Sequence, residues 1–286
     1  MAKSETELRS MMAKGKDLRE LPWFDAEIDE VPEPAKTILE RYSQIPADQI
    51  LDHVKGVRKR AFEVFPYPCI GSYRFLDMSI PESPVYPEVL QRLKSGQKLL
   101  DVGCAIGQEL RKLVYDGVPG ENLYASDLRG EFFDIGYDLF KDRSTLKAKF
   151  ISTDIFDNNS ELIKTLLHQV DIVNAASFFH LFSWDSQVLI GKRLVSLLRA
   201  QPGSLIIGRQ VGRIDPIDPD DKENAPEHYR HDDKTWLRLW EQIQRETGTQ
   251  WEVFSRLEEW KGADKLMKSY HNGLQTFKLR FVIRRI

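Results

Sequence analysis

The sequence predicts an α/β fold, in which a helical N-terminal segment precedes a sheet of seven strands that is parallel except for its last strand. Two observations lead to this prediction. Residues 1–90 contain almost no strand-like runs, whereas after Leu99 short apolar segments alternate with amphipathic ones, as a parallel sheet requires. The segment from Leu99 to Leu110 also reads as a buried strand that turns sharply into a helix through a loop of small residues. Such a junction is where open α/β sheets bind nucleotide-like ligands.

The N-terminal third reads as short helices separated by proline-containing loops. Apolar residues recur mostly every three or four positions between Asp48 and Phe65, which predicts an amphipathic helix, and a second helix is expected at Glu88–Lys94. A mostly helical segment of about ninety residues needs a large apolar surface to cover. We therefore expect residues 1–90 to form a cap or lid over the ligand-binding edge of the sheet, and residues 91–286 to form the domain that contains the sheet.

The remaining elements alternate between strand and helix. We expect seven strands, at Leu99–Asp101, Leu123–Asp127, Phe150–Asp154, Val170–Ala176, Ser204–Val211, Gln250–Leu257 and Leu274–Ile286. The last two lie too close together for a helical crossover, so they are expected to pair antiparallel. Helices are expected from Leu110 onward, at Val188–Leu198 and at Thr235–Glu246. An insert at about residues 212–233 leaves the carboxyl end of the fifth strand, where long loops usually cover binding sites.

The loop after the first strand favours a cationic ligand over a phosphate. Gly103 and Gly107 can adopt positive φ or let a ligand contact the backbone, but the spacing G-x-A-x-G differs from the G-x-G-x-x-G pattern that binds a pyrophosphate. Glu109 lies in the first helical turn, where it would repel a phosphate, and Asp101 suits an amine or another cation. S-adenosylmethionine (SAM) carries a sulfonium and an amino acid end, and it has no phosphate. At Ala105 a methyl group is tolerable if φ is negative, so we interpret this position as a variant of the loop.

Two further acids follow the next two strands. Asp127 ends the second expected strand, where a carboxylate can accept hydrogen bonds from both ribose hydroxyls. Asp154 ends the third, and the apolar residues around it could enclose an adenine. A lone acid at such a position is as often a helix cap or a turn residue, but three acids at successive strand ends indicate a SAM site. We predict that SAM contacts Asp101, Gly103, Ala105, Gly107, Asp127, Leu128, Asp154, Ile155 and Asn174.

This order of strand, loop, helix and strand-end acids resembles the class I SAM-dependent methyltransferases. Four segments are also similar to a group of fungal secondary-metabolite methyltransferases that includes carboxyl O-methyltransferases of meroterpenoid pathways; they are Leu21–Phe24, Phe65–Gly71, Arg74–Asp77 and Arg111–Gly117. The resemblance implies a Rossmann-like sheet of seven strands with the last antiparallel, and SAM as the cofactor. It also implies methyl transfer to an oxygen, with a carboxylate favoured, of a hydrophobic metabolite such as a polyketide–terpenoid intermediate. The alternatives are methylation of a hydroxyl or a carbon, a SAM-binding cyclase or rearrangement catalyst, and a non-catalytic partner.

Whether the reaction needs a general base depends on the acceptor, because a carboxylate is ionised at neutral pH and a phenol is not. Two histidines are candidates for a catalytic role. His180 follows the fourth strand and His231 lies in the insert, although His180 could equally cap a helix and His231 could be solvated surface. Six residues are candidates for binding the acceptor, namely Tyr73, Arg74, Phe178, Phe179, Tyr229 and Arg230. We expect the cap and the insert to close over the site, with Arg74 and His231 facing the acceptor and His180 beside the methyl group.

Composition narrows the range of partners. The net charge is −3 and the isoelectric point is about 6.1, so neither a broad basic surface nor a nucleic-acid partner is expected. The two cysteines, Cys69 and Cys104, lie in different segments and are expected to be reduced, as in a cytoplasmic protein. No apolar run is long enough to span a membrane, the N-terminus lacks the apolar core of a signal peptide, and no metal-ligand cluster is evident. The expected partner is a small hydrophobic acceptor, and a homodimer is compatible with the sequence.

Overall fold

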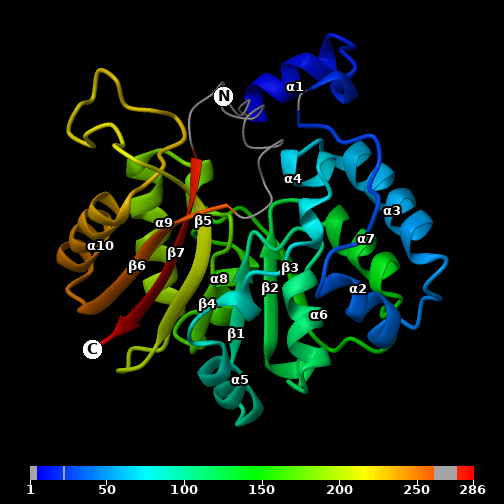
Figure 1. The fold of residues 1–286 in the computed structure, drawn as a ribbon. Coiled ribbons are helices and arrows are strands. Elements are labelled where there is room, and N and C mark those ends of the chain that lie inside the picture. The colour runs from blue at the N-terminus through cyan, green and yellow to red at the C-terminus, as the bar shows by residue number, and fades with distance from the viewer. Residues whose placement is uncertain (1–4, 22, 261–275) are drawn as a thin grey trace.

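A computed structural model describes residues 5–21, 23–260 and 276–286, and within them a seven-stranded sheet forms the centre of the molecule (Figure 1). The strand order is β3-β2-β1-β4-β5-β7-β6. Strands β1 to β5 are parallel, whereas β7 lies between β5 and β6 and is antiparallel to both. The predicted fold class is confirmed. The strands are β1 (Leu99–Val102), β2 (Leu123–Asp127), β3 (Lys149–Ser152), β4 (Ile172–Asn174), β5 (Leu205–Arg213), β6 (Trp251–Glu259) and β7 (Thr276–Arg285).

The strand order reverses at β1, which has β2 on one side and β4 on the other. In this register Asp101 of β1 lies opposite Ala125 of β2 and Asn174 of β4. Ligands of α/β sheets bind outside the carboxyl ends of the strands at such a reversal. The loop after β1 and the ends of β2 and β4 meet at this edge of the sheet, which is called the carboxyl edge below.

Helices cover both faces of the sheet. Leu100 and Val102 of β1 pack in one apolar cluster with side chains of α8, α9 and α10, whereas Leu99 packs in another with side chains of α5 and α6. Alternate residues of a strand point to opposite faces, which explains this division. These helices are α5 (Tyr86–Lys94), α6 (Gln108–Tyr115), α7 (Glu131–Phe140), α8 (Glu161–Leu166), α9 (Trp184–Leu197) and α10 (Asp233–Thr247), with short turns η5 (Gly120–Asn122) and η6 (Phe179–Leu181) between them.

Most element boundaries differ from the expected ones by a few residues, and two of the differences are informative. Helix α9 begins at Trp184, before the first apolar residue of the sequence pattern, because the Ser183 side chain accepts a hydrogen bond from the Ser186 N–H and so caps the helix. Strand β3 ends at Ser152, so Asp154 lies in the turn after the strand and not at its last residue.

The N-terminal segment is helical, as predicted, and packs largely against α7. Helix α3 lies beside α7 (Figure 1), and its apolar side chains share a cluster with Phe132, Leu139 and Phe140 of that helix. The turn α4 lies at the carboxyl end of the sheet, opposite α5 (Figure 1). The predicted boundary at residue 90, between an N-terminal cap and the domain that contains the sheet, stays a prediction. The N-terminal elements are α1 (Glu5–Ala13), η1 (Leu18–Glu20), α2 (Ala35–Thr37), η2 (Ile38–Tyr42), α3 (Ile50–Val64), α4 (Pro68–Gly71), η3 (Arg74–Leu76) and η4 (Ile80–Glu82).

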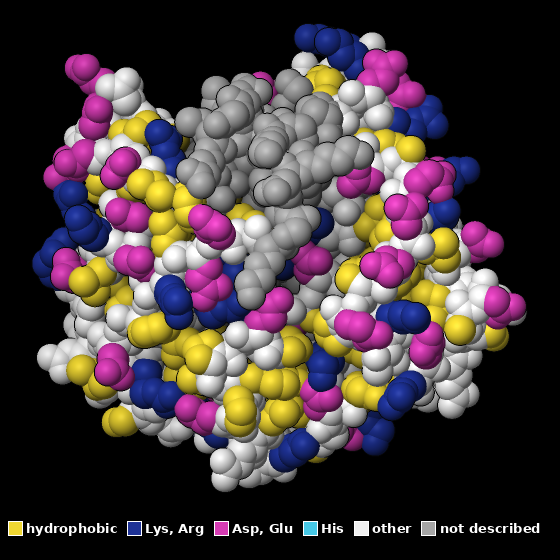
Figure 2. All heavy atoms as spheres, in the orientation of Figure 1, with side chains coloured by type: hydrophobic (Ala, Val, Ile, Leu, Met, Phe, Trp, Pro, Cys, Tyr) yellow, Lys and Arg dark blue, Asp and Glu magenta, His cyan; other side chains and the backbone are white. Residues whose placement is uncertain are grey.

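Acidic and basic side chains are mixed over the face of the molecule seen in Figure 2, with apolar side chains between them. Among the helices that the structure describes, none is both long and apolar enough to cross a membrane.

Candidate active site

The loop at residues 103–107, called the glycine loop below, connects β1 to α6 through three residues with positive φ. They are Gly103 (+66°), Ala105 (+47°) and Gly107 (+71°). The expectation of a negative φ at Ala105 is wrong. Its N–H donates a hydrogen bond of 2.9 Å to Asp127 Oδ2, and this bond accompanies the left-handed conformation. A non-glycine residue in that conformation costs about 1–2 kcal/mol, and such residues are often found at functional sites.

Asp127 is the last residue of β2 and lies at the carboxyl edge, where the sequence predicted it. Its Oδ2 accepts from the Ala105 N–H and its Oδ1 from the Arg129 N–H at 3.0 Å. Each carboxylate oxygen can accept a second hydrogen bond, so the group can still receive two hydroxyls. Leu128 follows with 52% of its surface exposed, which leaves an apolar side chain open beside the carboxylate.

Asp101 and Asn174 form a buried polar pair at the ends of neighbouring strands. Asn174 Nδ2 donates to Asp101 Oδ1 at 2.7 Å, while the buried Asn174 Oδ1 accepts no hydrogen bond from the described residues. Burial raises the pKa of Asp101 well above its usual range, and the carboxyls of Glu109 and Asp127 raise it further. Three carboxyl groups and a vacant acceptor therefore surround the glycine loop.

This set of groups fits SAM and not a phosphate. A cationic ligand relieves the mutual repulsion of the carboxyls, whereas a phosphate would increase it. Asp101, Asn174 and the glycine loop would hold the charged end of SAM, and Asp127 and Leu128 its nucleoside. When bound, SAM supplies a methyl group already activated for transfer, so the protein must mainly orient the acceptor and exclude water.

Glu109 has a role that the sequence did not reveal. Its carboxylate is buried in the first turn of α6 and accepts hydrogen bonds from the Ser79 hydroxyl at 2.7 Å and from the Ile80 N–H at 3.1 Å, besides the Ser79 N–H. It thereby fastens the N-terminal segment to the helix that follows the glycine loop.

The Asp154 region lies farther out. The Asp154 side chain is exposed, and its Oδ1 accepts from the Phe156 N–H at 2.9 Å, which is the turn role that the sequence analysis also considered. Ile155 is half-buried. Phe156 and Phe182 lie edge to face with ring centroids 5.6 Å apart, and Phe182 in turn contacts Phe178 at 5.2 Å. A row of aromatic rings thus leads from this turn to the glycine loop.

The segment after β4 brings some predicted residues to the site and buries others. Phe178 packs so closely on the glycine loop that a Cβ at Gly103 would lie 2.5 Å from its ring. His180 is half-buried in η6. Phe179 is fully buried between Trp236 and Phe281, so the expectation that it contacts the acceptor is wrong: its ring completes the apolar core.

His231 and Tyr229 are also core residues. The His231 ring lies among Trp184, Tyr229 and Trp236, with centroids 4.8–5.5 Å away, and it is fully buried. Burial lowers the pKa of His231 to about 3, so the ring is neutral at physiological pH.

The hydrogen bonds of His231 and Tyr229 also indicate that these side chains have a structural role. His231 Nε2 bonds to Gln187 Oε1 at 2.9 Å, and the Tyr229 hydroxyl donates to the Ile217 carbonyl oxygen. The expectation that these two residues face the acceptor is therefore wrong, and so is the alternative that His231 is solvated surface, because the insert folds back and packs them against α9 and α10. Arg230 between them is half-buried.

Of the two neighbours Tyr73 and Arg74, the first is buried and the second is partly exposed. Tyr73 is buried, and its hydroxyl accepts a hydrogen bond of 2.7 Å from Arg58 Nη2, so the expectation that it contacts the acceptor is wrong. Arg74 remains partly exposed. Its Nε donates to Asp77 Oδ2 at 3.0 Å, and its guanidinium lies 4.3 Å from the centre of the Trp260 ring.

Arg209, which the sequence analysis missed, lies beside Arg74. It extends from β5 two residues beyond the register partner of Asn174, and its Nη1 donates to the Ser177 hydroxyl at 2.5 Å. Its guanidinium lies 5.4 Å from the Trp260 ring and 3.6 Å from Asp77 Oδ2. An arginine within an apolar strand was the signal that could have indicated it. Within the described residues, no group of acidic, histidine or cysteine side chains is arranged to hold a metal ion.

Comparison with known proteins agrees with this geometry. Residues 23–76 match a family model described as the N-terminal domain of meroterpenoid methyltransferases. The chain is 46% identical over 261 residues to the asnovolin E/chermesin D methyltransferase of Aspergillus novofumigatus, covering 91% of this chain and 92% of that protein. It is 44% identical to an O-methyltransferase of a fungal species (93% of each chain) and 45% identical to a methyltransferase of Penicillium roqueforti (93% of this chain and 94% of that one).

Solved structures show the same fold at low sequence identity. The CurJ carbon methyltransferase superposes with a TM-score of 0.51 at 16% identity, covering 98% of this chain and 70% of that one. A sarcosine dimethylglycine methyltransferase assigned in Galdieria sulphuraria gives 0.50 at 13% identity, covering 80% and 98%. With the sheet, the acidic glycine loop and relatives at about 45% identity over nearly their whole length, the chain belongs to the meroterpenoid methyltransferases and is a SAM-dependent methyltransferase.

Proposed function

We propose that the enzyme transfers the methyl group of SAM to a carboxylate oxygen of a small hydrophobic meroterpenoid intermediate. The observation that carries this proposal is the largely buried guanidinium of Arg209 at the carboxyl edge. The printed name of one relative, an O-methyltransferase, supports transfer to oxygen.

The charges around Arg209 favour an anionic acceptor. Arg209 and Arg74 share the carboxylate of Asp77, with Nη2–Oδ2 distances of 3.6 and 2.9 Å. Burial lowers the pKa of Arg209, and the positive charge of Arg74 lowers it further. A carboxylate from the acceptor would offset this repulsion, and a guanidinium binds a carboxylate with two parallel hydrogen bonds.

The surroundings also suit an acceptor that is otherwise apolar. Phe178 and Phe182 form an aromatic wall toward the glycine loop, and the Trp260 ring lies against both arginines. The side chain of Arg209 keeps 11% of its surface exposed, so it is not completely enclosed in the core. Arg209 and Ser177 would orient the carboxylate, while the aromatic rings would exclude water from it.

A carboxylate acceptor needs no general base, because it is ionised at neutral pH. This agrees with the complete burial of the His231 ring, which leaves it out of contact with an acceptor. A hydroxyl acceptor would instead require a base, and His180 is the candidate from the sequence analysis that remains at this edge.

The proposal is tested with SAM carrying a labelled methyl group and a lipophilic extract from a meroterpenoid-producing fungus. We expect labelled product and S-adenosylhomocysteine in equal amounts, and a label that mild alkali releases, since methyl esters are saponified. A label stable to alkali would overturn the carboxylate assignment in favour of hydroxyl or carbon methylation. An acceptor that is converted without S-adenosylhomocysteine would indicate a cyclase or rearrangement catalyst.

Arg209 is tested separately by substitution. Arg209→Gln should raise the KM for the acceptor at least about tenfold, because a charge-assisted bidentate contact is lost, while the affinity for SAM stays within about twofold. The matched control is Arg256→Gln, which alters an exposed arginine on β6 and should leave both constants unchanged. An unchanged acceptor KM in Arg209→Gln would contradict the proposed contact.

A further inference from the structure

A buried ion pair lies directly behind the glycine loop. The guanidinium of Arg111, in α6, is fully buried and donates to both carboxylate oxygens of Asp142, from Nε to Oδ2 at 2.9 Å and from Nη2 to Oδ1 at 3.1 Å. Asp142 follows α7. A bidentate pair of this kind fixes both the place and the plane of the guanidinium.

The third nitrogen of the same guanidinium holds the glycine loop. Arg111 Nη1 donates to the carbonyl oxygens of Ile106 at 3.0 Å and Gly107 at 3.2 Å. Packing at this point is close: a Cβ at Gly107 would lie 2.6 Å from Nη1, and a Cβ at Gly136 would lie 2.2 Å from the Ile106 carbonyl oxygen. The end of the glycine loop therefore cannot move without moving Arg111.

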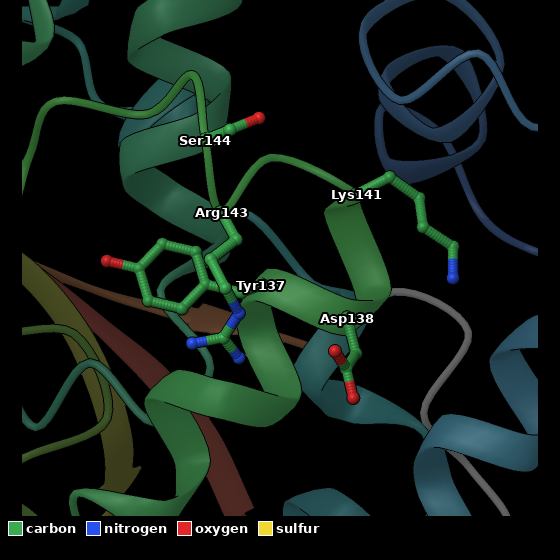
Figure 3. A pocket seen from close by; sticks show the side chains of 5 residues that line it. All are labelled: Tyr137, Asp138, Lys141, Arg143 and Ser144. Atoms are coloured by element: carbon green, nitrogen blue, oxygen red, sulfur yellow. The ribbon is translucent and has the colours of Figure 1, made fainter.

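The N-terminal segment reaches the same ion pair. Tyr42, in η2, donates its hydroxyl to Asp142 Oδ2 at 2.9 Å. The rings of Tyr137, Phe140 and Phe150 surround the guanidinium, with centroids 5.1–5.2 Å from its carbon. Tyr137 also lines a surface hollow of about 470 Å³ at the end of α7, together with Asp138, Lys141, Arg143 and Ser144 (Figure 3).

Stability alone does not account for this arrangement. Burying two charges is expensive even when they pair, and well-packed apolar residues of similar volume are often as stabilising or more so. An apolar side chain, however, could not donate to the two loop carbonyls, and buried carbonyl groups need a partner. We propose that Arg111 is a positioning residue for SAM binding, and that the Tyr42 hydroxyl sets its place through Asp142. The N-terminal segment thereby tunes the affinity of the glycine loop for SAM.

The chain contains a matched control for Tyr42. Tyr86, in α5, donates its hydroxyl to Asp116, which also pairs with Lys112 of α6. As at Tyr42, a tyrosine hydroxyl binds an aspartate that also binds a basic side chain of α6. This second group lies toward the C-terminal end of α6, and none of its described hydrogen bonds reaches the glycine loop. Tyr42→Phe and Tyr86→Phe each remove one hydroxyl and keep the ring.

The test is the binding of SAM and of S-adenosylhomocysteine, measured by isothermal titration calorimetry on the full chain. We expect Tyr42→Phe to raise both Kd values about three- to tenfold, the size of couplings carried by connected buried contacts, and Tyr86→Phe to leave them within about twofold. Arg111→Lys should raise them more than about tenfold, because an ammonium cannot bind Asp142 bidentately and the loop at once. In turnover, the KM for SAM should rise while kcat at saturating SAM and the acceptor KM change little.

Two results would overturn the proposal: an unchanged Kd in Tyr42→Phe, or equal weakening in Tyr42→Phe and Tyr86→Phe. The second result would mean that the effect follows from general loss of stability, which thermal melting of both variants measures independently. If Arg111→Lys does not fold, the two tyrosine variants decide the question by themselves.

Discussion

Replacing His231 by alanine tests whether this residue is structural or catalytic. The ring fills a fully buried space between three aromatic side chains, and its Nε2 bonds to Gln187 Oε1. Gln187 Nε2 donates to the carbonyl oxygens of Phe182 and Tyr229, so its Oε1 is the acceptor and Nε2 of His231 carries the proton. Alanine would leave both a cavity and a buried acceptor without a partner.

The magnitude follows from these two losses. Truncating a buried aromatic ring to alanine costs about 3–5 kcal/mol, and leaving a buried acceptor without a partner costs about 1–3 kcal/mol more. We therefore expect His231→Ala to lower the free energy of unfolding by at least about 4 kcal/mol and the Tm by roughly 10 °C or more. Urea unfolding and thermal melting measure these changes.

The pH dependence gives a second, independent readout. The pKa of His231 is about 3 in the folded protein and 6.5 as the ordinary value, so the unfolded chain binds the proton more strongly. The contribution of this group to stability is complete above pH 6.5 and is lost as the pH falls from 6.5 toward 3. Between pH 7.5 and pH 5.5 this loss amounts to about 1.4 kcal/mol. The variant His231→Phe lacks this titration, so its stability relative to the native protein should rise by that amount.

Activity decides between the two roles. Measured at a temperature where both proteins are folded, the turnover of His231→Ala should stay within a few-fold of the native value, with the same pH profile. A general base would instead cost about 10²-fold or more and shift the profile. A variant with native Tm and a hundredfold lower kcat would refute the structural role. His180→Ala, at the carboxyl edge, is the comparison for a base acting on a hydroxyl acceptor.

Two further predictions concern the glycine loop. Ala105→Gly should raise the free energy of unfolding by about 0.5 kcal/mol and leave the activity unchanged. Glycine relieves the left-handed strain of about 1–2 kcal/mol, but it loses about 0.5–1 kcal/mol because the unfolded chain becomes more flexible. If urea unfolding shows that the variant is less stable than the native protein, Ala105 is not strained. Gly103→Ala should raise the Kd for S-adenosylhomocysteine about tenfold or more, because the added Cβ would lie 2.5 Å from the Phe178 ring. Gly96→Ala is the control and should not change this Kd. Gly96 also has a positive φ, but nothing lies within 4 Å of a Cβ added there. If the two glycine variants have equal Kd values for S-adenosylhomocysteine, the Phe178 ring can move without weakening binding, and the prediction is wrong.

The sequence by itself determined the sheet, the position of the glycine loop and the positions of Asp101 and Asp127 near the ends of their strands. These features depend on neighbouring residues: apolar runs specify strands, Gly103 and Gly107 permit a sharp turn, and an acid that follows a parallel strand must lie at the carboxyl edge. For the same reason the antiparallel last strand followed from the short connection before it. The predicted SAM contacts of these residues stay predictions.

The tertiary structure alone decided which side chains face the site. His231, Tyr229, Phe179 and Tyr73 lie in segments that are polar or irregular in sequence, yet packing between distant elements buries all four. In the sequence, Arg209 is one residue of an apolar strand. Its hydrogen-bond partner Ser177 and its ion-pair partner Asp77 lie in other segments, which only the fold brings next to it. Burial and pairing are set by contacts between residues far apart in the chain, and no local pattern records them. The sequence could therefore specify where the cofactor site forms, while the acceptor side of that site depended on the complete fold.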